Sequence, residues 1–290
     1  CFILNVFTYQ ELSFQKMKMH GIENHEIGQE VKVIEASSEY FNSTAIFNLF
    51  KDLFGFVLFM HQQIPSTLQD LSLKFKDLLV EKQMLENGSG AIDLPRLRRQ
   101  HMMKKRENRQ GIKRLDKLMQ SINRFEDSLT SLITQGTYVE RVIFVLGSNP
   151  LRPFCAYELS FPNLKVSIPG TCSDISNSKA ATALSRKVIR TLIANGAGSS
   201  SYPGPSKIFF LIKAAPCLNL PLNFTPKRDF KLCKKVNTFR IQISPKPKII
   251  SLNHNDFSSQ SLKDNSSNEL IWYQCRHVVK GLMSNSSPED

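Results

Sequence analysis

The sequence has no long apolar run. Its two most apolar stretches, residues 1–7 and 53–60, are far shorter than the roughly 20 residues that span a bilayer, and Gly55 interrupts the second. The first stretch has neither a basic flank nor a small-residue cleavage site. We therefore expect no signal peptide and no membrane partner.

The six cysteines form no CxxC pair. Cys275 lies two residues before His277, but no second Cys/His pair completes a zinc site. An even number of cysteines can also form disulfides in a secreted protein. Without a signal peptide, free thiols in a reducing compartment are favoured, and we expect no metal site.

Catalytic motifs are also missing. Gly147-Ser148-Asn149 follows an expected strand, as a phosphate-binding loop would, but Pro150 comes next and no Lys-Ser/Thr pair follows. The glycine-rich loop at 196–199 precedes a strand rather than a helix N-terminus. The six histidines are scattered, and neither GxSxG nor HExxH occurs. The sequence therefore predicts a protein without enzymatic activity and without a cofactor.

Acidic residues are scarce: 25 stand against 38 basic residues, which gives a net charge of +13. Such a balance favours an acidic partner. The excess is concentrated at 96–117, which overlaps a basic insert at about 86–110. We expect this basic region to be a loop or the start of a helix. A solvated loop, a nuclear import signal and a nucleic-acid contact all fit this segment, although the lack of interleaved aromatics argues against stacking on single strands. The import signal would consist of Arg98, Arg99, Lys104, Lys105 and Arg106.

Hydrophobic periodicity predicts helices at 43–61, 66–79, from 112 onward and at 179–195. The first is apolar nearly all round, which is typical of a helix in the middle of a fold. Strands are predicted by short apolar runs, which lie at 139–146, 156–166, 208–213, 238–244 and 270–279. This order indicates an α+β fold with a mainly antiparallel sheet covered by about three helices.

The helix at 179–195 carries two apolar stripes. Leu184, Val188 and Leu192 form the first, which can face the sheet. Ile189 and Ile193 form the second, displaced by roughly 100° and bordered by cations at 186, 187 and 190. An apolar strip with a cationic rim is typical of a protein-binding face, although a helix buried on two sides fits equally well.

Three blocks of sequence, far apart in the chain, are specific in residue type and spacing. The first is 49–65, which ends in His61-Gln62-Gln63-Ile64-Pro65. The second runs from Arg-Val-Ile-Phe-Val-Leu-Gly-Ser-Asn at 141–149, through Leu151 and Pro153, to Tyr-Glu-Leu at 157–159. The third is Ile-Trp-Tyr-Gln at 271–274 followed by Lys280-Gly281. Together these blocks resemble the comet family of Mad-two-binding adaptors, and their order and spacing agree with that family from about residue 42 to 282.

The resemblance implies a HORMA-like domain, an α/β domain whose C-terminal segment can wrap as a safety belt. We expect this domain at 42–284, with a weakly patterned, flexible segment at 1–41 and a flexible tail at 285–290. It also implies binding to closed Mad-two, or to related HORMA proteins in meiosis. The bound client would be delivered to a hexameric AAA+ ATPase of the pachytene-checkpoint type. This delivery would silence the spindle checkpoint. The implied location is the nucleus, with cytoplasm, spindle or kinetochore during division.

The family's contact residues are carried over by position. Its partner-facing apolar residue falls on Ile189, where the family is often aromatic, and its first-helix contact falls near Met60, where a polar residue is found elsewhere. Lys187 and Ile193 complete the expected Mad-two face. The family's ATPase-facing pair matches Pro226-Lys227 in type at both positions. The alternative function is a basic nuclear protein that binds nucleic acid through residues 96–117.

Overall fold

The computed structural model describes residues 31–35, 41–87, 95–134, 139–162, 166–167, 174–199, 204–216, 222–244 and 270–282. The chain divides into two units, 1–30 and 31–290, and all described residues belong to the second. The expectations for 1–30, for 88–94 within the basic insert and for 285–290 lie outside the described residues.

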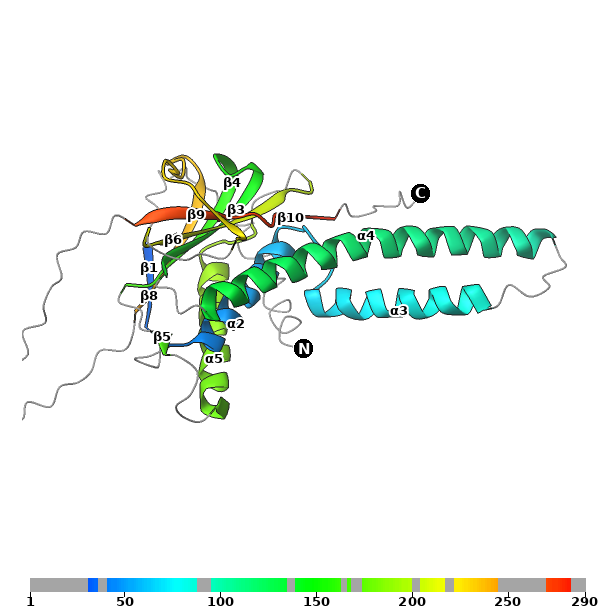
Figure 1. The fold of residues 1–290 in the computed structure, drawn as a ribbon, viewed down its shortest axis with the longest axis horizontal. Coiled ribbons are helices and arrows are strands. Elements are labelled where there is room, and N and C mark those ends of the chain that lie inside the picture. Colours follow the sequence, from blue (N-terminus) through cyan, green and yellow to red (C-terminus); the bar gives the residue numbers. More distant parts are fainter. Residues whose placement is uncertain are drawn as a thin grey trace, which may run out of the picture. The chain divides into compact units, whose positions relative to one another are not determined.

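The centre of the second unit is an eight-stranded sheet in the order β1-β8-β4-β3-β6-β9-β7, with β10 also paired to β6 (Figure 1). Only the β1–β8 and β4–β8 pairs are parallel. The strands are β1 (Val31–Glu35), β3 (Val139–Asn149), β4 (Arg152–Ser160), β6 (Lys207–Ala214), β7 (Phe224–Pro226), β8 (Asn237–Ser244), β9 (Ile271–Cys275) and β10 (Val279–Lys280). β2 (Phe41–Asn42) and β5 (Val166–Ser167) form a separate parallel pair.

Four helices are described: α2 (Ser43–Met60), α3 (Leu68–Asn87), α4 (Pro95–Thr134) and α5 (Asp174–Ala194). The expected α+β class with a mainly antiparallel sheet is confirmed. Thr67 caps α3: its hydroxyl oxygen accepts from the Asp70 N–H at 3.2 Å and donates to the Asp70 carboxylate at 2.7 Å. α4 begins with a proline, which has no backbone N–H. The N–H groups of a first helical turn have no acceptor within the helix, so a proline there removes no helical hydrogen bond.

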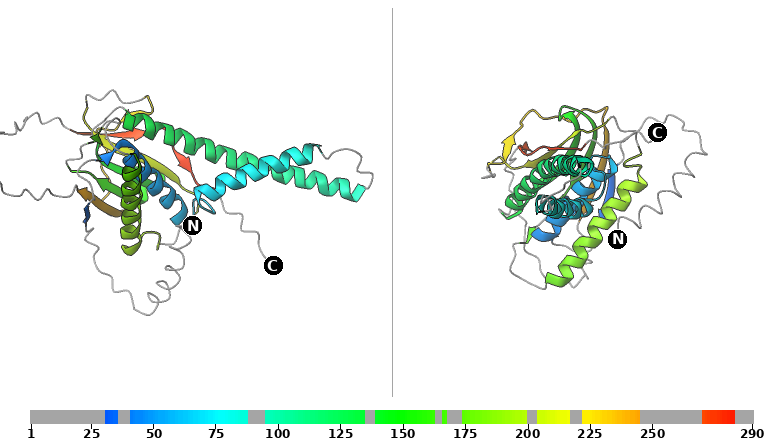
Figure 2. Two further views of the ribbon diagram at one scale, coloured as in Figure 1. Left: turned by 90° about the horizontal axis from the view of Figure 1, so that it is seen from below. Right: turned by 90° about the vertical axis from the view of Figure 1, so that its right-hand side faces the viewer.

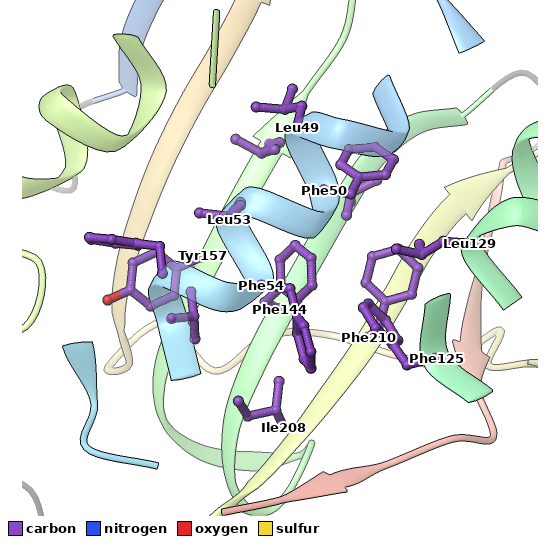
Figure 3. Packing of buried hydrophobic residues seen from close by; sticks show 14 of the residues in the cluster. Leu49, Phe50, Leu53, Phe54, Phe125, Leu129, Phe144, Tyr157, Ile208 and Phe210 are labelled. Carbon is purple, nitrogen blue, oxygen red and sulfur yellow. The ribbon is translucent and has the colours of Figure 1, made fainter. Parts of the chain in front are cut away.

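The alternation of side chains along the strands divides the core into two clusters. On one face, Phe144 of β3 and Phe210 of β6 contact Phe54 of α2 and Phe125 of α4, with ring centroids 4.3–6.3 Å apart (Figure 3). On the other face, Ile143, Val145, Ala156, Phe209 and Leu211 pack beneath Phe230 and Val236 from the β7–β8 connection. α2 is buried on most sides, as its all-round apolar sequence predicts.

One expectation about organisation is wrong, and one alternative that the sequence left open is decided. Residues 1–41 were expected to be flexible, but Val31–Glu35 forms the edge strand β1, paired in parallel with β8. Its Ile34 is 2% exposed and belongs to the core on the helix-covered face. This burial stabilises a strand whose own sequence shows little hydrophobic pattern. Of the two forms expected for the basic residues, a loop or the start of a helix, those from 95 onward adopt the helix. They continue the helix predicted from 112 into one helix of 40 residues, side by side with α3 (Figures 1 and 2).

Candidate protein-binding surface

α5 presents the two stripes that its sequence predicts. Leu184, Val188 and Leu192 are 8%, 0% and 1% exposed and belong to the main core. Ile189 and Ile193 pack against that core but remain only partly buried. Arg186 and Arg190 lie on the solvent side of the second stripe and are exposed. α5 thus carries a half-buried isoleucine pair beside two cations.

Met60 lies at the end of α2, against the turn that closes α5. Its side chain covers Gly198, where an added Cβ would lie 2.6 Å from the Met60 Cε. Gly198 also has a φ of +84°, which L side chains rarely adopt. This glycine therefore lets α2 and the end of α5 approach each other, and it places Met60 at the same end of α5 as Ile193.

Lys187 lies on a different flank of α5 from the isoleucine stripe. It is two residues from Ile189, which is about 160° around a helix. Its Nζ donates to the Glu35 carbonyl oxygen of β1 at 3.1 Å. The structure thus groups Met60 and Ile193 at one end of α5, one turn from Ile189, and places Lys187 at the joint between α5 and β1.

Pro226 and Lys227 lie at the end of the edge strand β7, and both are exposed. An edge position suits a proline, which cannot donate to a neighbouring strand. The Lys227 N–H donates to the Trp272 carbonyl at 2.7 Å, and the Phe230 N–H donates to the Lys227 carbonyl at 3.1 Å. The Phe230 and Trp272 rings meet edge to face at 5.5 Å. This turn therefore holds the Pro-Lys pair in a defined position.

The expected import-signal residues lie on α4 and are distributed around the helix. Lys104 faces α3 and pairs with Glu81 at 3.1 Å, while Lys105 is half-buried. Arg98, Arg99 and Arg106 are exposed. The import function of these residues stays a prediction.

Sequence reasoning did not find the buried polar contacts that join the three motif blocks. His61 Nε2 and Tyr157 Oη are 2.6 Å apart, and both residues are 1% exposed. Gln63, 0% exposed, donates to the His61 carbonyl at 2.6 Å and accepts from the Ser206 N–H at 2.8 Å. Its own carbonyl accepts from the Leu282 N–H at 2.7 Å. We call these Gln63 contacts the Gln63 clasp, which fastens the C-terminal segment to the end of α2.

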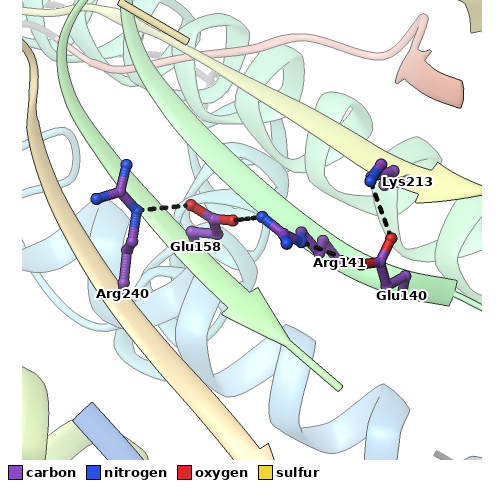
Figure 4. A network of polar contacts seen from close by, with 5 residues as sticks. All are labelled: Glu140, Arg141, Glu158, Lys213 and Arg240. Atoms are coloured by element: carbon purple, nitrogen blue, oxygen red, sulfur yellow. Dashed lines mark hydrogen bonds and ion pairs between the residues drawn. The ribbon is translucent and has the colours of Figure 1, made fainter. Parts of the chain in front are cut away.

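A chain of ion pairs runs across the sheet face that the helices leave uncovered (Figure 4). Glu158 of β4 accepts from Arg141 of β3 at 3.1 Å and from Arg240 of β8 at 3.0 Å. Glu140 pairs with Arg141 at 3.4 Å and with Lys213 at 3.1 Å. Because these are neighbouring positions of paired strands, the network supports the strand register.

The largest pKa shifts belong to core residues. Burial lowers the pKa of His61 to about 4 and raises that of Cys155 to about 12. Burial also raises the pKa of Tyr157 well above its usual value, so its hydroxyl stays protonated and can donate to a neutral His61. Thiols with raised pKa values are poor nucleophiles, which makes Cys155 a structural residue.

We expect the free energy of unfolding to fall as the pH is lowered, because of His61. Above pH 6.5 the imidazole is neutral in both the folded and unfolded chain. As the pH falls from 6.5 toward 4, the unfolded chain binds a proton that the folded chain excludes, which removes about 3 kcal/mol of stability. Urea unfolding between pH 7 and pH 5 should show about 2 kcal/mol of this loss, and His61→Gln should flatten the profile. An unchanged slope in His61→Gln would contradict the assignment.

Within the described ranges, no three His, Cys, Asp or Glu side chains gather as metal ligands, and no helix is long and apolar enough to cross a membrane. Among the described cysteines, Cys155, Cys233 and Cys275 are free. What the arrangement offers chemically is a half-buried apolar strip on α5 and a fixed Pro-Lys turn at β7. Neither a protein-family model nor a curated protein matches the chain.

Proposed function

We propose that this chain is a HORMA-like adaptor of the comet family. It binds the closed conformer of Mad-two and presents it to a hexameric AAA+ ATPase of the pachytene-checkpoint type. The ATPase hydrolyses ATP, and the adaptor supplies recognition. The result is disassembly of the mitotic checkpoint complex, with chromosome-axis HORMA proteins as further clients in meiosis.

The order and spacing of the three motif blocks support this proposal. Their central residues are buried and touch one another, through His61 with Tyr157 and Gln63 with Gly281 and Leu282. Such contacts constrain residue type strongly, since a buried polar group without its partner is costly. The blocks thus act as determinants of the fold, and the mixed sheet with its fastened C-terminal segment is compatible with a HORMA-like domain.

The half-buried pair Ile189 and Ile193 is the observation that carries the client-binding half of the proposal. Fully buried isoleucines would have no free surface to offer, and fully exposed ones would not be held in place. A half-buried pair offers ordered apolar area, which is the usual centre of a protein interface. Arg186 and Arg190 supply the polar rim.

The arrangement of the sheet supports the proposal of an adaptor that holds two partners at once. β1, which Lys187 joins to α5, and β7, which ends at Pro226, form opposite edges of the sheet. Six strand spacings separate these edges, or about 29 Å. A client on α5 and an ATPase at the Pro-Lys turn can therefore bind simultaneously, as an adaptor requires.

The proposal is tested by ATP-dependent opening of closed Mad-two in the presence of this chain and the ATPase. We expect the wild-type chain to stimulate the opening. Pro226→Ala with Lys227→Ala should stop it while leaving capture of closed Mad-two unchanged, because both side chains are exposed and away from α5. The matched control is Arg228→Ala with Lys231→Ala on the same connection. Normal opening with the Pro226/Lys227 variant would contradict the ATPase assignment.

A further inference from the structure

α4 has two halves with different surroundings. Its C-terminal half is part of the core, where six residues are at most 6% exposed: Leu115, Leu118, Ile122, Phe125, Leu129 and Leu132. Its N-terminal half lies beside α3 and extends beyond the sheet in the same unit (Figures 1 and 2). The proposed adaptor function uses neither α3 nor this half of α4.

The hairpin of α3 and α4 is held together by specific contacts. Asn108, 5% exposed, donates to the Leu78 carbonyl at 3.1 Å and to the Glu81 carboxylate at 2.8 Å. Lys104 pairs with the other oxygen of the same carboxylate, and Leu78 also lies beside Gly111 of α4. These contacts fix which side of α4 faces α3, and hence which side faces away.

The side of α4 that faces away from α3 carries a row of cations. Arg99, Arg106 and Lys113 follow one another at steps of seven residues, so they lie on one face with about 10 Å between successive members. Arg109 and Lys117 extend the row to about 27 Å. All five are exposed, and within the part of the chain that the structure describes none of them makes an ion pair.

Two exposed methionines interrupt the row of cations. Met102 and Met103 are 60% and 72% exposed and flank the line from Arg99 to Arg106. We call Arg99, Met102, Met103, Arg106, Arg109, Lys113 and Lys117 the α4 outer face. Methionine is flexible and adapts to apolar partner surfaces, so the face combines adaptable apolar contact with regularly spaced positive charge.

We propose that the α4 outer face docks an acidic amphipathic helix of another protein. The charge repeat of seven residues matches a partner helix that carries Asp or Glu at the same interval, with apolar residues between them to cover the methionines. A phosphate backbone offers nothing apolar to these methionines. A membrane is disfavoured because Arg106 lies between them around the helix, which leaves no continuous apolar face to insert. The inference is independent of the adaptor function.

The test uses a fluorescent peptide of about 20 residues with Glu every seventh residue and Leu between, titrated with the full chain in fluorescence anisotropy. We expect micromolar binding, weakened more than about tenfold by Arg99→Glu/Arg106→Glu/Lys113→Glu. The control Arg228→Glu/Lys231→Glu/Lys235→Glu changes the net charge equally on the β7–β8 connection and should bind normally. Unchanged thermal melting shows that each variant is folded.

Two further reagents separate docking of a helix from general attraction of anions. Met102→Ser with Met103→Ser should weaken peptide binding about fivefold, whereas binding of a duplex DNA of about 20 base pairs would depend only on charge and salt. A peptide with the same acids but two prolines cannot fold as a helix and should bind poorly. No peptide binding, equal binding of the proline peptide, or tighter DNA binding that ignores the methionines would each overturn the proposal.

Discussion

Ile189→Arg should abolish capture of closed Mad-two by this chain while leaving the fold intact. The Ile189 side chain is half-buried on α5, so a guanidinium at this position can still reach water in the free protein. Beneath a bound partner the same charge would be buried without a counterion, which costs roughly several kcal/mol. Affinity capture with purified proteins measures the loss, and thermal melting should show little change.

The controls for Ile189→Arg come from the same helix. Ile189→Val removes one methylene and should keep most of the binding. Lys187→Ala acts on the opposite flank, where Lys187 holds Glu35 of β1. Loss of capture in Lys187→Ala would place Lys187 in the client interface, and retained capture would restrict it to the joint with β1. Unchanged capture by Ile189→Arg would refute the assignment of this surface.

Gln63→Leu should cause the largest loss of stability, about 3 kcal/mol, because one buried and one part-buried partner lose their hydrogen bonds. These partners are the His61 carbonyl and the Ser206 N–H, at 2.6 and 2.8 Å from the Gln63 side chain. Gly281 packs so closely on Gln63 that a Cβ there would collide with its side chain. Chemical unfolding measures the loss, and hydrogen exchange should show faster opening of Val279–Lys280.

The neighbouring residue of the same motif provides the control for the Gln63 clasp. Gln62 is exposed and has a φ of +50°, which glycine adopts without strain. Gln62→Gly should therefore be neutral or slightly stabilising. A destabilisation equal to that of Gln63→Leu would show that the loop backbone, rather than the Gln63 hydrogen bonds, fastens the C-terminal segment.

Elements with a strong local pattern could be predicted from the sequence. The apolar helix at 43–61 is α2, and the apolar runs around 142–146 and 208–213 are β3 and β6. The two stripes of α5 follow from helical periodicity. The first is buried, and the second is partly buried, an arrangement that the sequence left open beside full burial on two sides. These predictions succeed because each depends on residues close together in the chain.

Other features depend on contacts that are distant in sequence. β1 is held by β8, about 200 residues later, and the first half of α4 by α3. The residues at 95–110 are mostly polar or charged and form no apolar stripe at helical spacing. The local sequence therefore could not distinguish a basic loop from a helix. The Gln63 clasp joins residues 63, 206 and 282, whose proximity no local pattern reveals.

Closed and open Mad-two, each immobilised separately and offered this chain at equal concentration, test the central proposal most directly. The account predicts capture by the closed form alone, and its loss in Ile189→Arg. Equal capture by both forms, capture by the open form, or no capture by either would contradict the proposal that this chain is an adaptor for closed HORMA proteins.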